Sequence, residues 1–555
     1  MKNLFNSISK REWYFLAVFC LTIILLTSIP YLIGILSAKE GFVYNGLRAL
    51  SPGDFPVYYS YIDQVKNGEF FVKNLFTGEH QDVGTFNVWW TWVGLMARFF
   101  NLPSALAFHL SRILTIPFFV VISYLFISYF FIEKIKRIIA WIFLFFSSGL
   151  GFYFIPVFES IEFSEADRYW WPIDLWLTEA TTFNVISQTS HFIASISLIL
   201  LIFLLTLLSF EKKIFSYALA SGFLALFYFN FHPYYFPVIF GVFGLYLFWL
   251  MIKKNKFLWH ESYYLVFVFL LSFPSVIYHF WLIKFSPVIG QRALQNVTTI
   301  SPFIFVLIGY GFLWLGLIFG LFFIFKQKKL NSRFVFLLCW LIVNLCLIYS
   351  PFPFNSRYTQ GLHIILVIFT VEGLFGIWFY LKSKINPDIF DFWINNKALM
   401  LMLFVVLFMP SVIFNYFRDF FIFIKKPTAQ SERLFFFSND LMESFQWLRQ
   451  KPSGKVVLAS DIPSKFIPGF SGKTVYFAHP HETIYFHSKA VWVFWFFSDN
   501  GNSSAKKRFL SEQGIDYILF SDYEKEIGNF DLAAEDYLEL VFDSPNSKIY
   551  QVIKD

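Results

Sequence analysis

The chain has 555 residues, of which 57% are hydrophobic, 23% are aromatic and only 15% are charged. Soluble proteins carry about 25% charged residues, so this composition and a mean hydropathy of +0.58 exclude an ordinary soluble protein and indicate a membrane protein. The net charge of +7 does not indicate a nucleic-acid partner, because the Lys and Arg residues lie in short loops between apolar runs, where they orient a membrane protein.

The apolar runs predict a polytopic α-helical membrane protein with about eleven transmembrane helices. The first run, Trp13–Leu36, follows a basic N-terminal segment and is too long for a signal-peptide core, so we interpret it as an uncleaved span. The other spans are expected near Ser104–Ile132, Ile138–Phe158, His191–Phe210, Ile214–Phe231, Tyr234–Ile252, Tyr263–Ile283, Phe303–Phe325, Phe334–Ser350, Leu362–Leu381 and Ala398–Phe417. The short pair on either side of His232 also allows a re-entrant hairpin.

The basic loops predict the orientation of the chain in the cell membrane. The N-terminal segment, Glu133–Arg137, Glu211–Lys213, Lys253–Lys256, Lys326–Arg333 and Lys382–Lys384 would all lie on one side, which is then the cytoplasm. The other side receives a first outer loop of about residues 37–103 and everything after about Arg418. The predicted domains are therefore a transmembrane domain, 1–418, and an extracytoplasmic domain, 419–555.

The tail from about Asp419 has the pattern of a small α/β domain. Helical spacing is seen over Asn439–Gln450 and Ala505–Gln513, whereas Lys455–Ser460, Lys473–Ala478 and Asp516–Ser521 have the pattern of buried strands. The last residues predict a closing hairpin around Ser544–Ser547. Strands that alternate with helices favour an α/β fold.

Polar side chains gather at the outer ends of the predicted spans, where they are informative because such groups are costly in lipid. His109 and Arg112 share a helix face because they are three residues apart, and Gln188 and His191 repeat that spacing. These four residues are predicted to line an outward-opening cavity together with Asp54, Asp63, His232, Arg357 and Tyr358.

Several of these residues also have a plainer interpretation. Asp54 precedes Phe55-Pro56 and can cap a helix, Asp63 can be a solvated helix residue, and Arg112 or His191 alone can be interfacial. In the tail, Ala478–Thr483 (AHPHET) contains His479, His481 and Glu482. Three candidate ligands without a fourth nearby favour an acceptor-binding loop over a metal site, so we expect neither a metal nor another cofactor.

An acidic residue in a long first outer loop, with an α/β tail on the same side, resembles the GT-C superfamily of membrane glycosyltransferases. This superfamily uses polyprenyl-phosphate-linked sugars and includes the dolichyl-phosphate-mannose protein mannosyltransferases. The segments SPGDFPVYYSYIDQ, SQTSHF, HPYYFP and NSRYTQGLHIIL are similar to uncharacterised bacterial proteins grouped with these enzymes. Family members usually carry a second acid one or two positions from the Asp, whereas here the next acid after Asp54 is Asp63, which leaves metal binding and the identity of the base open.

The resemblance implies inverting transfer of a sugar from a polyprenyl-phosphate donor to a glycan, lipid or protein acceptor on the outer face. Asp54 would be the catalytic base. Arg112 and Arg357 would stabilise the leaving phosphate through the guanidinium fork, and His191 and His232 would donate hydrogen bonds. Two other classes are open: a transporter or flippase of lipid-linked sugars, with Glu372 in the tenth span as a proton relay, and a non-catalytic envelope assembly protein.

Overall fold

The computed structural model describes residues 2–50, 52–159, 171–384, 396–425, 429–498 and 502–554. Ser51 of the SPGDFP segment and residues 160–170 of a predicted outer loop lie outside these ranges. The chain forms two compact units. The first unit comprises Met1–Ile29, Arg112–Ile277 and Thr298–Arg418, and the second comprises Pro30–Ser111, Tyr278–Val297 and Asp419–Asp555.

Seven apolar helical stretches among the described residues are long enough to cross a membrane, judged by length and composition. They are α2 (Lys10–Leu36), α5 (Ser104–Phe130), α6 with α7 (Lys134–Val157), α10 (Ser190–Lys212), α12 with the preceding turn (Pro233–Lys254), α13 (Trp259–Phe285) and α18 with the preceding turn (Asn355–Lys382). The number rises to nine if two bent pairs are each one span: α15 (Phe303–Tyr310) with α16 (Phe312–Lys326), and α20 (Lys397–Phe408) with α21 (Pro410–Phe420).

Each of the eleven predicted apolar runs coincides with one of these elements, with α11 (Phe215–Phe231) or with α17 (Ser332–Ile348). Helices α11 and α17 have 17 residues each. They are therefore about 25 Å long, which is shorter than a hydrocarbon core of about 30 Å. The helices therefore support seven to nine spans, and the count of eleven stays a prediction.

The two bent pairs break where the sequence interrupts helical hydrogen bonding. Between α15 and α16, Gly311 adopts a φ of +47°, a conformation that favours glycine, and the helices bend by 79°. Between α20 and α21 the bend is 75°, and Pro410 begins the second helix without a backbone N–H to donate.

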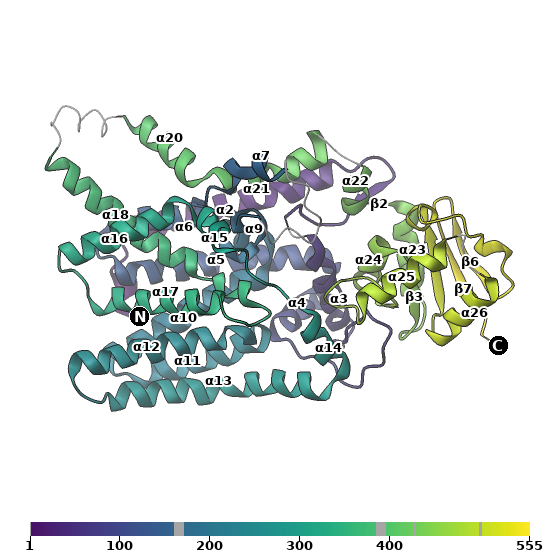
Figure 1. Ribbon diagram of the computed structural model, residues 1–555, viewed down its shortest axis with the longest axis horizontal. Coiled ribbons are helices and arrows are strands. Elements are labelled where there is room, and N and C mark those ends of the chain that lie inside the picture. The colour runs from purple at the N-terminus through teal and green to yellow at the C-terminus, as the bar shows by residue number, and fades with distance from the viewer. Residues whose placement is uncertain are drawn as a thin grey trace. The chain divides into compact units, whose positions relative to one another are not determined.

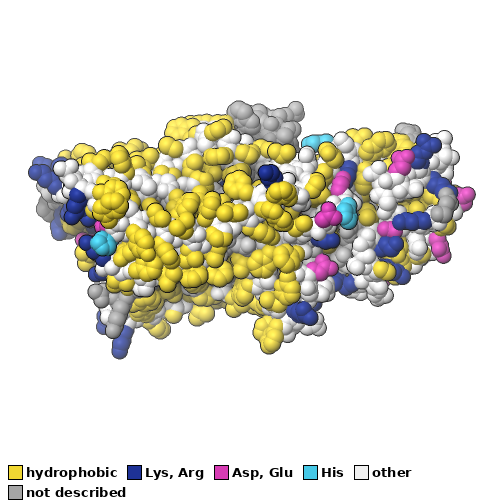
Figure 2. All heavy atoms as spheres, turned by 90° about the horizontal axis from the view of Figure 1, so that it is seen from below, with side chains coloured by type: hydrophobic (Ala, Val, Ile, Leu, Met, Phe, Trp, Pro, Cys, Tyr) yellow, Lys and Arg dark blue, Asp and Glu magenta, His cyan; other side chains and the backbone are white. Residues whose placement is uncertain are grey.

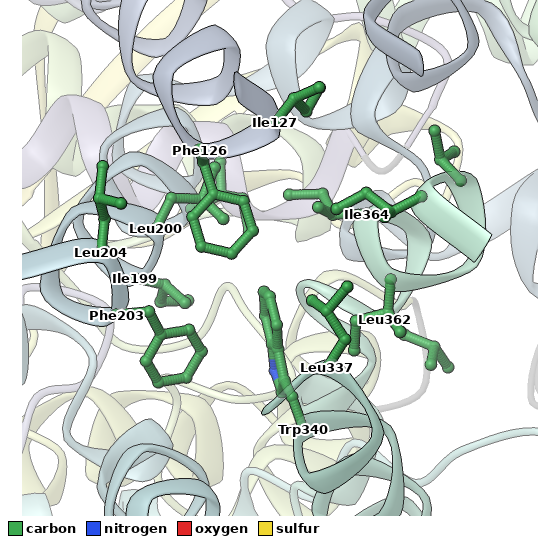
Figure 3. Packing of buried hydrophobic residues seen from close by; sticks show 14 of the residues in the cluster. Phe126, Ile127, Ile199, Leu200, Phe203, Leu204, Leu337, Trp340, Leu362 and Ile364 are labelled. Atoms are coloured by element: carbon green, nitrogen blue, oxygen red, sulfur yellow. The ribbon is translucent and has the colours of Figure 1, made fainter. Parts of the chain in front are cut away.

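The core of the first unit forms where its long helices meet (Figure 3). Trp340 of α17 is fully buried, and its ring lies 4.8 Å from the ring of Phe203 in α10 and 6.1 Å from that of Phe126 in α5. Leu362 and Ile364 of α18 complete the cluster. The same unit packs α10 on α11 and α12 on α17 (Figure 1).

The outward surface of several helices is apolar. Figure 2 shows a broad surface of hydrophobic side chains with few charged side chains within it. On α13, for example, only 28% of the most apolar stretch is buried, and Val266 and Leu270 are exposed. Such a surface is what a helix presents to lipid, where no apolar core has to cover it.

The second unit contains a five-stranded sheet in the order β4-β3-β5-β7-β6. The strands are β3 (Val456–Leu458), β4 (Thr474–Val475), β5 (Tyr517–Ser521), β6 (Leu538–Ser544) and β7 (Ser547–Val552). The first three are parallel, and β7 pairs antiparallel with both β5 and β6. The predicted small sheet and its closing hairpin are thus present.

The second unit also contains the predicted first outer loop. Its strand β1 (Phe42–Tyr44) pairs antiparallel with β2 (Phe436–Ser438). The helices of the unit are α3 (Phe55–Lys66), α4 (Val88–Phe99), α14 (Pro287–Gln295), α22 (Ala429–Phe435), α23 (Asn439–Arg449), α24 (Asp461–Ser471), α25 (Phe486–Phe497), α26 (Ser503–Glu512) and α27 (Asp522–Lys525). α3 packs against α4 and α24.

Candidate functional site

Asp54 stands at the start of α3, a helix held rigidly within the second unit. Ten of the twelve residues of α3 are buried, so the helix is packed on nearly all sides. A 3-10 turn, Pro52–Asp54, leads into it, and Pro56 lies in its first turn, where a missing N–H is harmless. Packing and turn chemistry therefore fix where Asp54 sits.

The Asp54 side chain does not cap the helix. Asp54 occupies the N-cap position, as its plainer interpretation predicted, but its side chain makes no capping hydrogen bond. Its carboxylate is 45% exposed, and Oδ1 lies 3.4 Å from Nε2 of His479. The carboxylate thus faces both solvent and a buried imidazole.

The loop that carries His479 holds the ring in one orientation. The backbone N–H of His479 donates to Thr483 Oγ1 at 3.0 Å, and the N–H of His481 donates to Nδ1 of His479 at 3.2 Å. Because Nδ1 accepts, the proton of the neutral ring belongs on Nε2, the nitrogen that faces Asp54. His479 can therefore donate to the Asp54 carboxylate.

An ion pair between the partly exposed Arg292 and the buried Glu482 anchors the same loop to α14. Arg292 Nε lies 2.7 Å from Glu482 Oε2, and the hydroxyl of Tyr61 in α3 is hydrogen-bonded to Arg292. Burial raises the pKa of Glu482, while Arg292 and His479 lower it and Asp54 raises it. Arg292, the only Lys or Arg in its helix, was not predicted as a site residue.

Across the described residues, no group of three or more His, Cys, Asp or Glu side chains is arranged to hold a metal ion. Glu482, the third acidic or imidazole group of this loop, is directed at Arg292 instead. The site offers a half-exposed carboxylate, an imidazole donor and an ion pair between the buried Glu482 and the partly exposed Arg292.

Asp63 is not the solvated helix residue that its plainer interpretation suggested. It is 2% exposed, and its Oδ1 lies 2.8 Å from Arg449 Nη2 of α23. Burial raises the pKa of Asp63, although Arg449 lowers it. Nine residues separate it from Asp54, which is about two and a half helical turns and places the two acids on opposite sides of α3.

His109 and Arg112 lie on the same helix, α5, and both contact neighbouring elements. In the second unit, Nε2 of His109 lies 3.1 Å from the carbonyl oxygen of Gly46, and its ring lies 4.1 Å from that of Tyr31. In the first unit, Arg112 is 1% exposed, and it donates to Thr27 Oγ1 at 2.7 Å and to Ser28 Oγ at 3.2 Å.

A second polar cluster lies in the first unit. Arg357 forms an ion pair with Glu179, which the sequence had not singled out, and its guanidinium lies 5.7 Å from the ring centre of Phe192. The rings of His191 and His232 are 5.4 Å apart. The structure therefore brings together His191 of the predicted fourth span, His232 of the turn after the fifth and Arg357 of the loop before the tenth.

Two further predicted residues lie buried in the first unit. Gln188, at the end of α9 (Thr182–Gln188), is 1% exposed. Tyr358 is fully buried, and its hydroxyl has no hydrogen-bond partner among the described residues. In the ion pair of Arg357 with Glu179, Arg357 is the more accessible partner: its side chain is 23% exposed, whereas that of Glu179 is 1% exposed.

The chain is similar in fold to solved glycosyltransferases, which is the fold expected from the resemblance to the GT-C superfamily. It resembles the crystal structure of the Archaeoglobus fulgidus oligosaccharyltransferase in the apo form, with a TM-score of 0.57, 12% identity, and coverage of 99% of this chain and 75% of that one. The archaeal oligosaccharyltransferase AglB in complex with an inhibitory peptide and a dolichol-phosphate gives a TM-score of 0.53, at the same identity and coverage.

The mycobacterial arabinofuranosyltransferase AftD is also similar in fold, with a TM-score of 0.52 and 12% identity; the match covers 99% of this chain and 42% of that enzyme. No protein-family model and no curated protein matches the sequence. At these identities the likenesses establish the fold, and a function must be argued from the site.

Proposed function

We propose that the protein is an integral-membrane glycosyltransferase that moves a sugar from a polyprenyl-phosphate-linked donor to an acceptor, with inversion and with Asp54 as the base. The observation that carries the proposal is the state of Asp54. On a chain with the GT-C fold, this carboxylate is rigidly placed and half exposed, and it makes no capping hydrogen bond.

The reaction needs one proton acceptor and one stabilised leaving group. The acceptor hydroxyl attacks the anomeric carbon, and Asp54 takes its proton as the new bond forms. The bond from that carbon to the phosphate oxygen breaks, and the phosphate leaves with the electron pair. Each step balances without a metal ion or another cofactor.

The neighbours of Asp54 would act by positioning it. Nε2 of His479 lies 3.4 Å from Oδ1 and can orient the carboxylate by donating to it. The Glu482–Arg292 pair fixes the loop that carries His479, since it ties that loop to α14. His479 and Arg292 are therefore proposed as positioning residues.

Arg357 is proposed to contact the donor phosphate, with His191 and His232 beside it. A guanidinium forms a bidentate fork with phosphate and stays charged. Arg112 is the weaker candidate, because it is 1% exposed and bonded to hydroxyls of α2. A lipid-linked donor is supported by the oligosaccharyltransferase of the same fold that was solved with a dolichol-phosphate. The acceptor can be a glycan, a lipid or a protein; a related structure carries a tethered acceptor peptide.

The transporter alternative depended on Glu372 as a proton relay. In the structure, Nζ of Lys136 lies 3.0 Å from Oε1 and 3.1 Å from Oε2 of Glu372. The pair compensates the charge of this carboxylate within the helices. Within the part of the chain that the structure describes, no contact of Glu372 favours proton transport over a structural ion pair.

The proposal is tested with Asp54→Asn in full-length protein reconstituted in lipid, using radiolabelled polyprenyl-phosphate sugars. We expect transfer to fall by about a hundredfold or more, the scale of general-base removal, while donor binding is retained. Asp543→Asn, an exposed Asp in β6, is the matched control and should transfer at the parent rate. Parent-rate transfer by Asp54→Asn would place the base elsewhere.

A further inference from the structure

Helix α25 of the second unit turns large apolar side chains outward. Val491 is 67% exposed, Trp492 48% and Phe494 62%, and Tyr485 just before the helix is 62% exposed. The inward side of the same helix already fills a core cluster with Val493, Phe496 and Phe497. The ring of Trp492 also lies 5.9 Å from that of Phe509 in α26, so packing accounts for part of this residue. It does not account for the exposure of Val491 and Phe494, since a helix on a sheet normally turns polar residues to water.

The charges of α25 are kept away from this outward face. Lys489, the only charged residue of the helix, is buried, and its Nζ lies 2.6 Å from Glu79 Oε1. The remaining exposed residues of the face are His487 and Ser488. A surface of Trp, Tyr, Phe and Val without a charged residue suits the boundary between lipid headgroups and acyl chains.

Hydrogen bonds connect α25 to the end of a membrane span. α14 begins at Pro287, directly after the last residues of α13, and is nine residues long, or about 14 Å. Gln295 at its end donates to the carbonyl oxygen of Thr483 at 2.9 Å and accepts from the N–H of Tyr485 at 3.2 Å. α25 thus starts one short helix away from α13.

Exposed apolar side chains occur on each element of this connection. Trp281 and Phe285 are exposed at the end of α13, and Leu294 is 74% exposed on α14. The same kind of surface therefore recurs from the span to α25, within one compact unit. Continuity with the apolar end of a span favours lipid as the occupant of the α25 face.

We propose that α25 docks on the surface of the bilayer that the chain spans, with Val491, Trp492 and Phe494 at the headgroup–acyl boundary. Because the face carries no Lys or Arg, docking depends on apolar burial and does not require anionic lipid. Glu482 lies three residues before Tyr485, so docking would hold the His479 loop close to the membrane surface. The inference does not depend on the proposed transferase activity.

The test uses full-length protein in lipid nanodiscs, one copy per disc. The native cysteines Cys20, Cys339 and Cys346 are replaced by Ser, and an environment-sensitive fluorophore is attached at Val491→Cys. The control is Ser511→Cys on α26, an exposed position two residues after Phe509, which points at α25. Lipids carrying a spin label near the headgroup serve as quenchers.

We expect the label at position 491 to be quenched several-fold more strongly than the label at 511, in neutral and in anionic lipid alike. Equal quenching at the two positions would overturn the proposal. So would a shielded but unquenched label at 491, which would show that protein covers the face. If the cysteine-free protein does not fold, hydroxyl-radical footprinting of unmodified protein decides: Trp492 and Phe494 should be protected in nanodiscs, whereas exposed Leu540 of β6 should react.

Discussion

At the scale of single residues, the site around Asp54 depends on which carboxylates are exposed and which are buried. Asp54 is nearly half exposed, whereas Glu482 is buried and paired with Arg292. This difference separates a group able to exchange a proton with a substrate from one that holds structure.

Arg292→Gln should destabilise the protein more than Arg292→Gln combined with Glu482→Gln. Removing one partner leaves a buried carboxylate uncompensated, at a cost of about 3 kcal/mol, whereas removing both leaves neutral groups. Thermal unfolding of the two single variants and the double variant gives the coupling free energy. Simple additivity of the two single effects would show that the pair is not coupled.

The deficit of Arg292→Gln should also grow as the pH rises. Burial holds the pKa of folded Glu482 above its ordinary value, so the folded state binds the proton more tightly than the unfolded state. The free energy of unfolding therefore falls as the pH rises from the unfolded pKa through the folded pKa. Arg292 lowers the pKa of Glu482, so its loss raises that pKa further and extends to higher pH the range over which the free energy of unfolding falls. The double variant, which has no carboxyl group at position 482, should not show this pH dependence.

Arg357→Lys should weaken donor binding although the charge is kept. Lys loses the planar fork, and one charge-assisted hydrogen bond is worth ~1.5 kcal/mol, or about tenfold in affinity. Binding of polyprenyl phosphate to protein in nanodiscs measures this effect. Lys284, an exposed residue at the end of α13, provides Lys284→Ala as the control, and equal affinity of Arg357→Lys and the parent would remove Arg357 from the donor site.

At the scale of elements, the membrane helices pack where small residues let backbones approach. α16 and α18 are in close contact: a Cβ on Gly320 of α16 would lie 2.2 Å from the carbonyl oxygen of Phe369 in α18. Such close approach is typical of helix pairs in membranes, where van der Waals packing drives association.

Gly320→Ala should therefore lower the unfolding temperature, because a backbone atom has to move to admit the methyl group. Overpacking of this kind costs about 1–3 kcal/mol. Gly244→Ala in α12 is the matched control, since nothing lies within 4 Å of its Cβ position, and helix propensity alone should leave it neutral or slightly stabilised. Equal unfolding temperatures for the two variants would contradict close packing of α16 on α18.

At the scale of the whole molecule, chain segments far apart in sequence form one compact unit. Arg48 in the first loop and Asp419 at the start of the tail form a buried ion pair at 2.6 Å. The same loop and tail are also joined by the pairing of strand β1 with strand β2. The loop and the tail are thus joined within the second unit. Their predicted location outside the cytoplasm follows from the basic loops alone.

We predict a cytoplasmic N-terminus and an extracytoplasmic tail. A reporter that is active only outside the cytoplasm, fused after Asp555, should be active, and the same reporter fused before the first span should not. As a control for expression, a reporter active only in the cytoplasm should give the opposite pattern. Cytoplasmic activity after Asp555 would refute the orientation.

The sequence by itself determined the apolar helices and most of the tail. A helix that spans lipid needs a long run of uncharged apolar residues, and a buried strand needs a short run rich in β-branched residues. Both kinds of run can be recognised in the local sequence. The runs near α2, α5 and α10 and the strands β3 and β5 were predictable for this reason. The count of seven to nine spans was less predictable, because the length of an apolar run does not reveal a bend such as the one at Gly311.

Only the tertiary structure decided which polar groups meet. The partners of Asp54, Glu482 and Arg357 come from distant segments of the chain. The sequence around a charged loop residue does not indicate which distant residue will pair with it. Asp63 has the helical setting of a solvated residue, yet Arg449 makes its burial possible. The outward face of α25 likewise depends on packing, because a helix that is apolar all round does not reveal in its sequence which side the core will cover.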